Sequence, residues 1–198
     1  MIRTGEQYKN GIRDGREVWI DGERVKDVTQ HPALRPIIDL KARMYDMAYE
    51  ERYAGALTYV DGDERHSIFL RPPRERKDWT DKLAAVDLLM KDIGGVGDET
   101  VSEMWSLADS RDVLAEIDPR FSANIDRHIR TVVEKDVFHV SANTDPKGDR
   151  SLPPQQQDPD MMVHVARETD AGIVIRGAKY ETAAAYADQA YLKPTAGA

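Results

Sequence analysis

The chain has 198 residues, which is long enough for one good-sized domain or for one domain and part of another. Its formal net charge of -8 disfavours a nucleic-acid backbone as a partner. The chain has no cysteine, which excludes disulfides, thiolate catalysis and cysteine-bound metal clusters. No run approaches the roughly 20 apolar residues of a membrane-spanning helix, and the first residues lack the apolar segment of a secretory signal. These features predict a cytoplasmic protein that does not bind membranes.

The first predicted elements are a short helix and two hairpins. Thr4 and Gln7 have the spacing of a capping box, which predicts a helix over residues 5–12. Asp-Gly pairs at residues 21–22 and 61–62 lie between β-prone runs. Such pairs favour the tight turn of a β-hairpin, so we expect a hairpin at each, with a type I′ turn at the first.

Longer helices are expected between and after these hairpins. Apolar residues recur at three- and four-residue spacing after the first hairpin, which predicts a helix there. The same spacing predicts a helix over residues 78–93, with Leu83, Val86, Leu89 and Met90 on one face.

The pattern then changes from helical to strand-like. A helix is predicted over residues 99–117, and another over 118–137 with Asp118 as its N-cap and Pro119 as its first helical residue. From Phe138 onward the apolar residues form short β-prone runs instead.

We therefore expect an α+β fold with two domains. Residues 1–137 would form a mainly helical N-terminal domain with two small hairpins, and residues 138–198 a partial β domain. Three or four short strands leave open edges, so this β part is too short to close a stable sheet by itself.

Two polar segments in the β part contain the side chains best suited to chemistry. The first reads FHVSANTDPKGDRS from Phe138, and the second reads IRGAKYET from Ile175. A histidine at a helix-to-strand junction is most often a half-buried structural residue, and Asp-Pro and Lys-Gly-Asp are ordinary turn formers. A glycine-containing turn beside an arginine could instead bind an anionic cofactor through its backbone N–H groups. On the residues alone, Arg150 could equally pair with a carboxylate of its own loop.

These two segments, together with RTGEQYKNGIRDGREVWIDGERVKDVTQHPA at residues 3–33, resemble the oxygenase components of the 4-hydroxyphenylacetate 3-monooxygenase family. Members of this family are two-component, FAD-dependent monooxygenases with an acyl-CoA dehydrogenase-like fold. That fold has a helical N-terminal domain, a central β-barrel and a C-terminal helical bundle. The resemblance implies that this chain provides the first domain and the first strands of the barrel, and that it is incomplete without a partner chain.

The resemblance also implies which residues form the site. His139 matches the histidine that faces the flavin and hydrogen-bonds the phenolic oxygen of the substrate. It is therefore expected to be both a catalytic and a substrate-binding residue, because a neutral imidazole can accept or return a proton near neutral pH. The residues expected to bind the flavin are Asn143, Asp145, Pro146, Lys147, Gly148, Arg150, Ser151 and Thr182.

The chain departs from the family at a second substrate-binding position. Phenol-hydroxylating members usually carry an Arg-x-x-x-Tyr pair upstream of the histidine, and the same register here falls on Asp98 and Ser102. An aspartate cannot bind a phenolate or a substrate carboxylate as an arginine would. Either the substrate differs, or another chain supplies the contacts, or the pocket is degenerate. The dehydratases of the same superfamily bind an iron–sulfur cluster through cysteines, so their reaction is excluded, and no residue spacing indicates a metal site.

The leading hypothesis is that the chain is the small, N-terminal-half subunit of a two-component FADH2-dependent monooxygenase. A separate reductase would supply reduced FAD, and an aromatic or similarly electron-rich small molecule would be oxygenated through a flavin C4a-hydroperoxide. Hydroxylation, dehalogenation, denitration and N-oxidation would all use the same residues. A second subunit would carry the C-terminal part, so the chain is expected to be inactive alone and to act in a hetero-oligomer. The alternatives are a non-catalytic structural or regulatory subunit of such a complex, and an artificially truncated domain.

Overall fold

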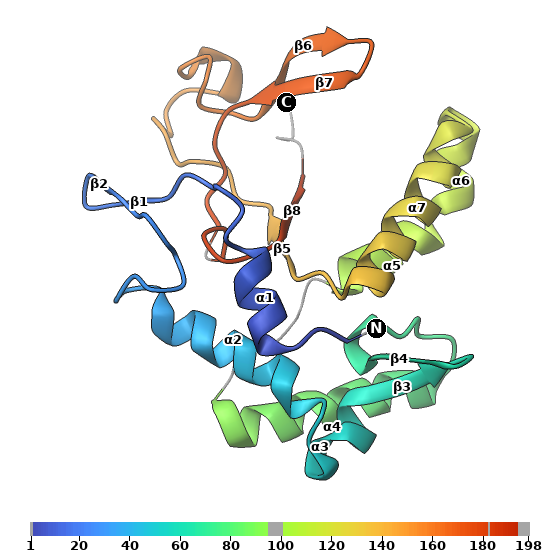
Figure 1. The fold of residues 1–198 in the computed structure, drawn as a ribbon. Helices are drawn as coiled ribbons and strands as arrows, with labels where there is room; N and C mark the ends of the chain where they lie inside the picture. The colour runs from blue at the N-terminus through green and yellow to red at the C-terminus, as the bar shows by residue number, and fades with distance from the viewer. Residues whose placement is uncertain (1, 95–100, 182, 194–198) are drawn as a thin grey trace. The chain divides into compact units, whose positions relative to one another are not determined.

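The computed structural model describes residues 2–94, 101–181 and 183–193, with side chains for all of these except residues 101–103 (Figure 1). The chain forms two compact units, Met1–Phe138 and His139–Ala198. Among the described residues every α-helix lies in the first unit, whereas the second consists of strands, loops and one 3-10 turn. The predicted α+β class, with helices preceding the larger share of strands, is confirmed. None of the helices in these ranges is long and apolar enough to cross a membrane.

The first unit is an assembly of helices with two small hairpins. Its elements are α1 (Gly5–Gly11), β1 (Trp19–Ile20), β2 (Glu23–Arg24), α2 (Arg35–Met47), α3 (Glu51–Leu57), β3 (Thr58–Asp61), β4 (Glu64–Ser67), η1 (Ile68–Leu70), α4 (Arg76–Ile93), α5 (Val101–Asp109), α6 (Arg111–Ile117) and α7 (Arg120–Lys135). Side chains from α2, α3, η1, α4, α5 and α7 form its main hydrophobic core, which includes Met47, Tyr53, Leu57, Phe69, Leu89, Met104 and Val132.

The start of the chain has the predicted elements. The Gln7 N–H donates to the Thr4 hydroxyl at 3.1 Å, and the Thr4 N–H donates to the Gln7 side chain at 2.8 Å, so the capping box of α1 is confirmed. Asp21 and Gly22 have φ values of 52° and 82°, as a type I′ turn requires, and they join β1 to β2. The first predicted hairpin is therefore confirmed.

The second hairpin and the helix before it differ in detail from the prediction. β3 and β4 pair with Asp61 opposite Glu64, so the two-residue turn lies at residues 62–63, one position later than expected. The helix predicted after the first hairpin is confirmed as α2, and a further helix that was not predicted, α3, follows it. Glu50 separates them because its backbone is extended, with φ -87° and ψ 132°.

Two further helix boundaries were predicted incorrectly. α5 and α6 are separate helices joined at Ser110, whose hydroxyl donates to the Ser106 carbonyl at 2.9 Å. Such a side-chain bond to the backbone competes with regular helix continuation. Pro119, rather than Asp118, is the N-cap of α7, although the Asp118 carboxylate still accepts the Arg120 N–H at 2.9 Å.

The buried face predicted for α4 is only partly correct. Leu89 is buried together with Ala85, and half-buried Val86 packs against the same core. Leu83 and Met90 are exposed instead. The observed buried face is therefore rotated by roughly a quarter turn from the predicted one, given 3.6 residues per helical turn.

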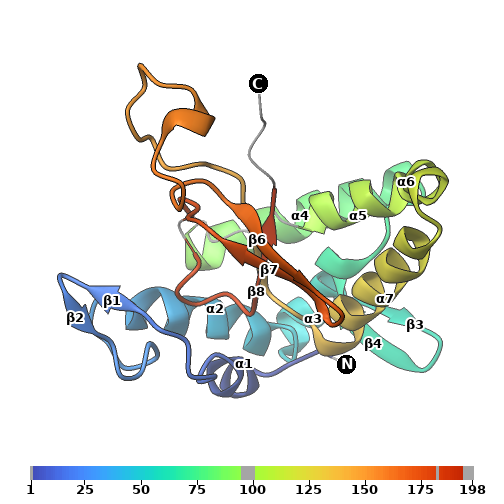
Figure 2. The same cartoon turned by 90° about the horizontal axis from the view of Figure 1, so that it is seen from above.

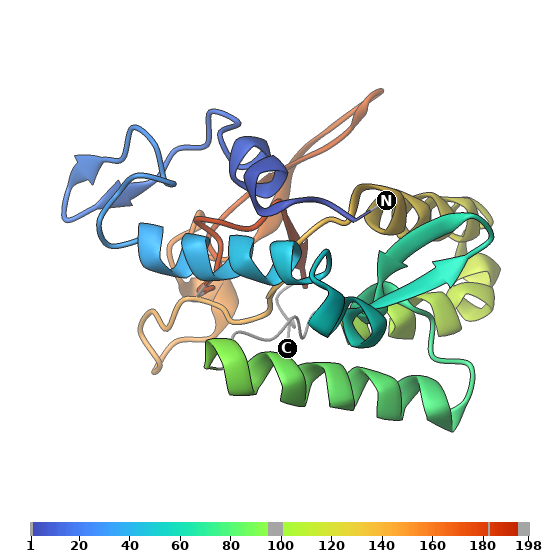
Figure 3. The ribbon, with the colours of Figure 1, turned by 60° about the horizontal axis from the view of Figure 1, so that its bottom comes forward.

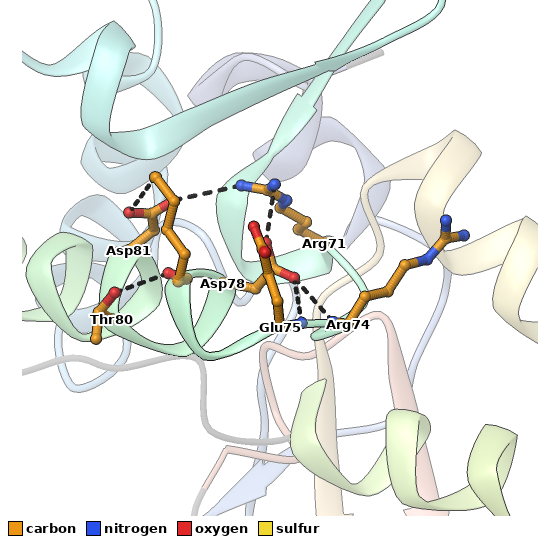
Figure 4. Close-up of polar contacts among 7 residues, drawn as sticks. Arg71, Arg74, Glu75, Asp78, Thr80 and Asp81 are labelled. Atoms are coloured by element: carbon orange, nitrogen blue, oxygen red, sulfur yellow. Dashed lines mark hydrogen bonds and ion pairs between the residues drawn. The ribbon is translucent and has the colours of Figure 1, made fainter.

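A buried carboxylate holds the N-terminus of α4 (Figure 4). Oδ2 of Asp78 accepts hydrogen bonds from the Arg74 N–H at 2.8 Å and the Glu75 N–H at 3.0 Å. The Arg71 guanidinium lies 2.8 Å from the other oxygen of Asp78 and 3.3 Å from Asp81. The two backbone hydrogen bonds, with the charge of Arg71 added, hold the pKa of Asp78 below its ordinary value.

The end of α7 is joined to the start of the chain. Asp136 ends the helix in the left-handed conformation, with φ 50°, and is buried. Its carboxylate accepts the Arg3 N–H at 3.1 Å, and its carbonyl accepts the Tyr45 hydroxyl at 3.3 Å. The Arg3 guanidinium donates to the Tyr45 hydroxyl at 2.7 Å. These bonds fix the backbone of the first unit just before it reaches Phe138.

The described residues of the second unit form two separate pairs of strands. β5 (His139–Ala142) pairs in parallel with β8 (Gln189–Leu192). β6 (His164–Thr169) pairs antiparallel with β7 (Gly172–Arg176), and Figure 2 shows these two strands side by side. The turn η2 (Pro154–Gln156) lies in the loop between β5 and β6. The strands expected after Phe138 are thus present.

The β6–β7 hairpin presents an apolar face to solvent. Val165 lies opposite Ile175, and Ile173 is on the same face two residues earlier in β7. All three side chains are exposed. A two-stranded hairpin has marginal stability in water unless further strands or a covering element bury its apolar face.

Substitution of Asp78 by asparagine is expected to make the chain less stable in a pH-dependent way. The folded pKa of Asp78 is lowered, so its stabilising effect is complete above the unfolded value of about 4 and is lost as the pH falls through the lower folded value. Thermal unfolding between pH 7 and pH 3 should show a lower Tm for Asp78→Asn at pH 7 and a narrowing difference toward pH 3. The control is Asp87→Asn, which removes only an exposed ion pair with Lys91. A Tm difference between Asp78→Asn and the wild type that does not change with pH would contradict this role.

Candidate functional site

The predicted catalytic histidine lies at the start of a strand. His139 is the first residue of β5 and lies opposite Gln189 of β8. Only 4% of its surface is exposed, so its imidazole is removed from bulk water. A histidine in such a position can act as a proton donor or acceptor toward a small molecule that reaches it, because either ring nitrogen can carry a proton.

The two polar segments that the sequence singles out lie side by side in the structure. The Tyr180 N–H donates to the Thr144 carbonyl at 2.8 Å, and the two residues form an isolated antiparallel bridge. Next to this bridge, the Lys179 ammonium lies 2.6 Å from the Asp145 carboxylate. The Lys179 side chain is only 4% exposed, so this ion pair is largely shielded from water and firmly joins the two segments.

The ion pair changes the role expected for Asp145. The resemblance placed Asp145 among the flavin-binding residues, but its carboxylate is engaged by Lys179, which the sequence reasoning did not single out. The only available signal was a lysine within the IRGAKYET motif, and a motif lysine does not by itself indicate burial. Asp145 therefore connects the two segments, and its contact with a flavin stays a prediction.

The turn that follows is held by its own side chains. The Asp149 carboxylate accepts hydrogen bonds from the Ser151 hydroxyl at 2.7 Å and from the Ser151 N–H at 2.9 Å, and these bonds lower the pKa of Asp149. The Gln157 side chain accepts the Asp149 N–H at 3.1 Å and donates to the Leu152 carbonyl at 2.9 Å. Ser151, another expected flavin ligand, thus has its hydroxyl directed to Asp149. Gly148, in the same turn, has φ 50°.

Two cationic side chains of this turn face solvent. Lys147 and Arg150 are both exposed, and within the described ranges neither has an ion-pair partner. The alternative that Arg150 pairs with a carboxylate of its own loop is therefore wrong. Asn143, at the start of the segment, is exposed as well, and Pro146 is half-buried. The turn can offer two positive charges and an amide to an anionic or electron-rich ligand.

A glycine allows the second segment to approach residues 161–162 closely. Gly177 has φ 117°, and a Cβ atom added there would lie 2.4 Å from the carbonyl oxygen of Met162. Directly after it, the Ala178 N–H donates to the Met161 carbonyl at 3.0 Å. Any side chain at this position would push the second segment away from residues 161–162.

The side chains of three predicted site residues lie outside the part of the chain that the structure describes. Asp98 and Thr182 lie outside the described residues, and Ser102 lies in α5 but its side chain is also outside them. Across the described part of the chain, no group of three or more histidines, aspartates and glutamates could hold a metal ion.

The close approach at Gly177 predicts a large effect of a single methyl group. Gly177→Ala should destabilise the chain by about 2 kcal/mol or more, because the left-handed conformation and the contact with Met162 both oppose a Cβ atom. Gly172→Ala is the matched control, since Gly172 also has a positive φ, 134°, but has nothing within 4 Å of the added atom. Urea unfolding of both variants would measure the difference. Equal losses of stability would show that the contact with Met162 is unimportant.

Comparison with known proteins shows the family to which the chain belongs. A family model described as "4-hydroxyphenylacetate 3-hydroxylase N terminal" matches residues 4–198. The oxygenase component of 4-hydroxyphenylacetate 3-monooxygenase from Thermus thermophilus is 30% identical over 201 residues, which cover 98% of this chain and 41% of that protein. The chain thus spans about two fifths of the length of this relative.

Solved structures agree with the sequence match. The oxygenase component of 4-hydroxyphenylacetate 3-monooxygenase complexed with FAD superimposes with a TM-score of 0.79 at 31% identity, over 89% of this chain and 38% of that one. A 4-hydroxybutyryl-CoA dehydratase from N. maritimus gives a TM-score of 0.82 at 25% identity, over 94% of this chain and 39% of that one. These likenesses confirm the acyl-CoA dehydrogenase-like fold that the resemblance implied. The chain belongs to the family of the 4-hydroxyphenylacetate 3-hydroxylase N-terminal region.

Proposed function

We propose that this chain is the N-terminal-half subunit of a two-component FADH2-dependent monooxygenase that oxygenates an aromatic or similarly electron-rich small molecule. The observation that carries the proposal is the Lys179–Asp145 ion pair, which brings together the two segments that the family resemblance assigns to flavin binding. A family relative with the same fold holds FAD in its solved structure.

The residues of the turn at 143–151 fit the cofactor. Lys147 and Arg150 are exposed cations without an ion-pair partner among the described residues, and they would bind the anionic phosphates of FAD. The Asn143 amide and the backbone of the turn around Gly148 would contact the electron-rich ring system. When bound, reduced FAD supplies the activation of dioxygen, and the protein supplies position and exclusion of water.

His139 would accept the phenolic proton of the substrate and later return it. Its imidazole is shielded from bulk water, so a hydrogen bond to a phenolic oxygen would be stronger there than at the surface. Removal of the phenolic proton makes the ring more electron-rich and more reactive toward oxygen transfer. The same proton can be returned when the product forms.

The substrate is expected to differ from that of phenol-hydroxylating relatives with an arginine in the second substrate position. Asp98 and Ser102 stand in that register, and we propose them as substrate contacts. An aspartate there disfavours a substrate with a carboxylate and favours one with a hydroxyl or a cationic group. The same substitution supports a second candidate, a non-catalytic subunit that stabilises or regulates a complete oxygenase.

The proposal requires further polypeptide. The matched relative has about three fifths of its length beyond the part that this chain covers. The exposed apolar face of the β6–β7 hairpin, formed by Val165, Ile173 and Ile175, supports the need for additional strands or a covering element. A second subunit would supply these parts, and a separate reductase would supply reduced FAD.

Purification of tagged chain from its native host tests the need for a partner. We expect a polypeptide that resembles the remaining three fifths of the relatives to co-elute in a defined ratio, and mass spectrometry would identify it. Elution of the chain alone, as a stable folded monomer or homodimer, would contradict the two-subunit proposal.

Substitution of His139 by alanine in that complex is expected to reduce substrate oxidation by about 100-fold or more, the usual contribution of a general acid–base. Complex assembly and FAD binding should be unchanged. His164→Ala is the control, because His164 is an exposed histidine of β6. Unchanged turnover of His139→Ala would remove this residue from the mechanism and would favour the non-catalytic alternative.

A further inference from the structure

Three large apolar side chains of α4 are exposed along one stripe of the helix. Trp79, Leu83 and Met90 are 48%, 67% and 49% exposed, although all three are large and apolar. With half-buried Val86 they follow a spacing of four, three and four residues. At 3.6 residues per turn, these four side chains fall within roughly 60° of one another around the helix. We call this set the α4 seam.

The seam is separate from the face that α4 already buries. Ala85 and Leu89 point into the core of the first unit and are 0% and 2% exposed. Figure 3 shows α4 along one side of the first unit, with α3 and α2 toward its inner side. The helix therefore has two adjacent apolar faces, of which one is buried in the core and the other is largely exposed. A surface helix that packs on one side normally has polar residues elsewhere.

The seam is continuous with the core. Val86 is half-buried and packs against the core cluster, and so does Ile93, which follows Met90 by three residues. The complete spacing from Trp79 to Ile93 is therefore four, three, four and three residues. This is the spacing of a helix that packs along a second helix with interlocking side chains.

Charged residues flank the α4 seam on both sides, as they do in helix pairs that pack in this way. On one flank, the Lys82 ammonium lies 5.5 Å from the centre of the Trp79 ring. On the other flank, Asp87 pairs with Lys91 at 2.6 Å. Charged residues next to an apolar seam set the orientation of a partner helix and keep water out of the contact.

We propose that the α4 seam binds an amphipathic α-helix of the second subunit. This inference rests on the proposed function, in which a second subunit supplies the three fifths of the fold that lie beyond this chain. Continuity with the core favours this occupant, because a helix on the seam would extend the core of the first unit. A second copy of the chain is a weaker occupant, since each copy brings a net charge of -8.

The double substitution Leu83→Glu and Met90→Glu tests the proposal in the complex purified with the tagged chain. Two charges in a desolvated helix contact should weaken association with the second subunit by at least about 30-fold, the effect of losing one strong interface contact. The isolated variant should keep the helical circular dichroism and Tm of the wild type, because both side chains are exposed. The matched control is Val113→Glu with Ile117→Glu, which charges an exposed apolar pair of α6 in the same unit.

The possible results separate the inference from the proposed function. Loss of association for the α4 variant but not for the α6 control supports the seam as the docking surface. Equal association of wild type and α4 variant, or equal loss in both variants, overturns the seam while the two-subunit proposal stands. If the wild-type chain captures no polypeptide resembling the remaining part of the relatives, both fail.

A photo-crosslinking residue in place of Leu83 identifies the occupant directly. We expect the crosslinked peptide to come from a helix-forming segment of the second subunit with apolar residues at the same spacing. A crosslink to another copy of this chain, or to residues 139–198 of the same chain, would overturn the proposal.

Discussion

The shielded ion pair between Lys179 and Asp145 is the interaction on which the candidate site depends. It joins the loop that follows β5 to the segment that follows β7, and the Thr144–Tyr180 backbone bond lies directly beside it. Removing Asp145 would leave the shielded Lys179 ammonium unpaired, which is far more costly than losing an exposed pair. The pair thus holds the two segments together as one surface, from which Lys147 and Arg150 extend toward solvent.

Single carboxylates with several hydrogen-bond partners also fix the backbone in the first unit. In the first unit, Asp136 ends α7 in a left-handed conformation and is tied to Arg3 and Tyr45, so the chain leaves the helix in a defined direction three residues before His139. Asp78 does the same for the N-terminus of α4. In each case one carboxylate with several partners sets the course of the backbone, and the apolar core fills the space between these fixed points.

The sequence predicted correctly the features that neighbouring residues determine, such as helix caps and tight turns. It did not predict the features that depend on contacts between distant residues, such as the buried face of a helix. The Thr4–Gln7 capping box and the turn at residues 21–22 were predicted correctly, because both are specified within four residues. The buried face of α4 was predicted with an error of about a quarter turn, because Leu83, Val86, Leu89 and Met90 are all apolar and only tertiary packing decides which of them is buried. Lys179 was missed as a structural residue for the same reason: its partner lies 34 positions away. His139 at the helix-to-strand junction was visible from the sequence, but its proposed role came from family resemblance.

Hydrogen–deuterium exchange of the purified complex, with and without reduced FAD under anaerobic conditions, tests whether the two joined segments bind the flavin. We expect slower exchange in residues 143–151 and 176–181 when reduced FAD is added, because the backbone N–H groups of these segments would contact the cofactor. Unchanged exchange in both segments despite demonstrated FAD binding to the complex would contradict this role. The flavin would then be held entirely by the other subunit.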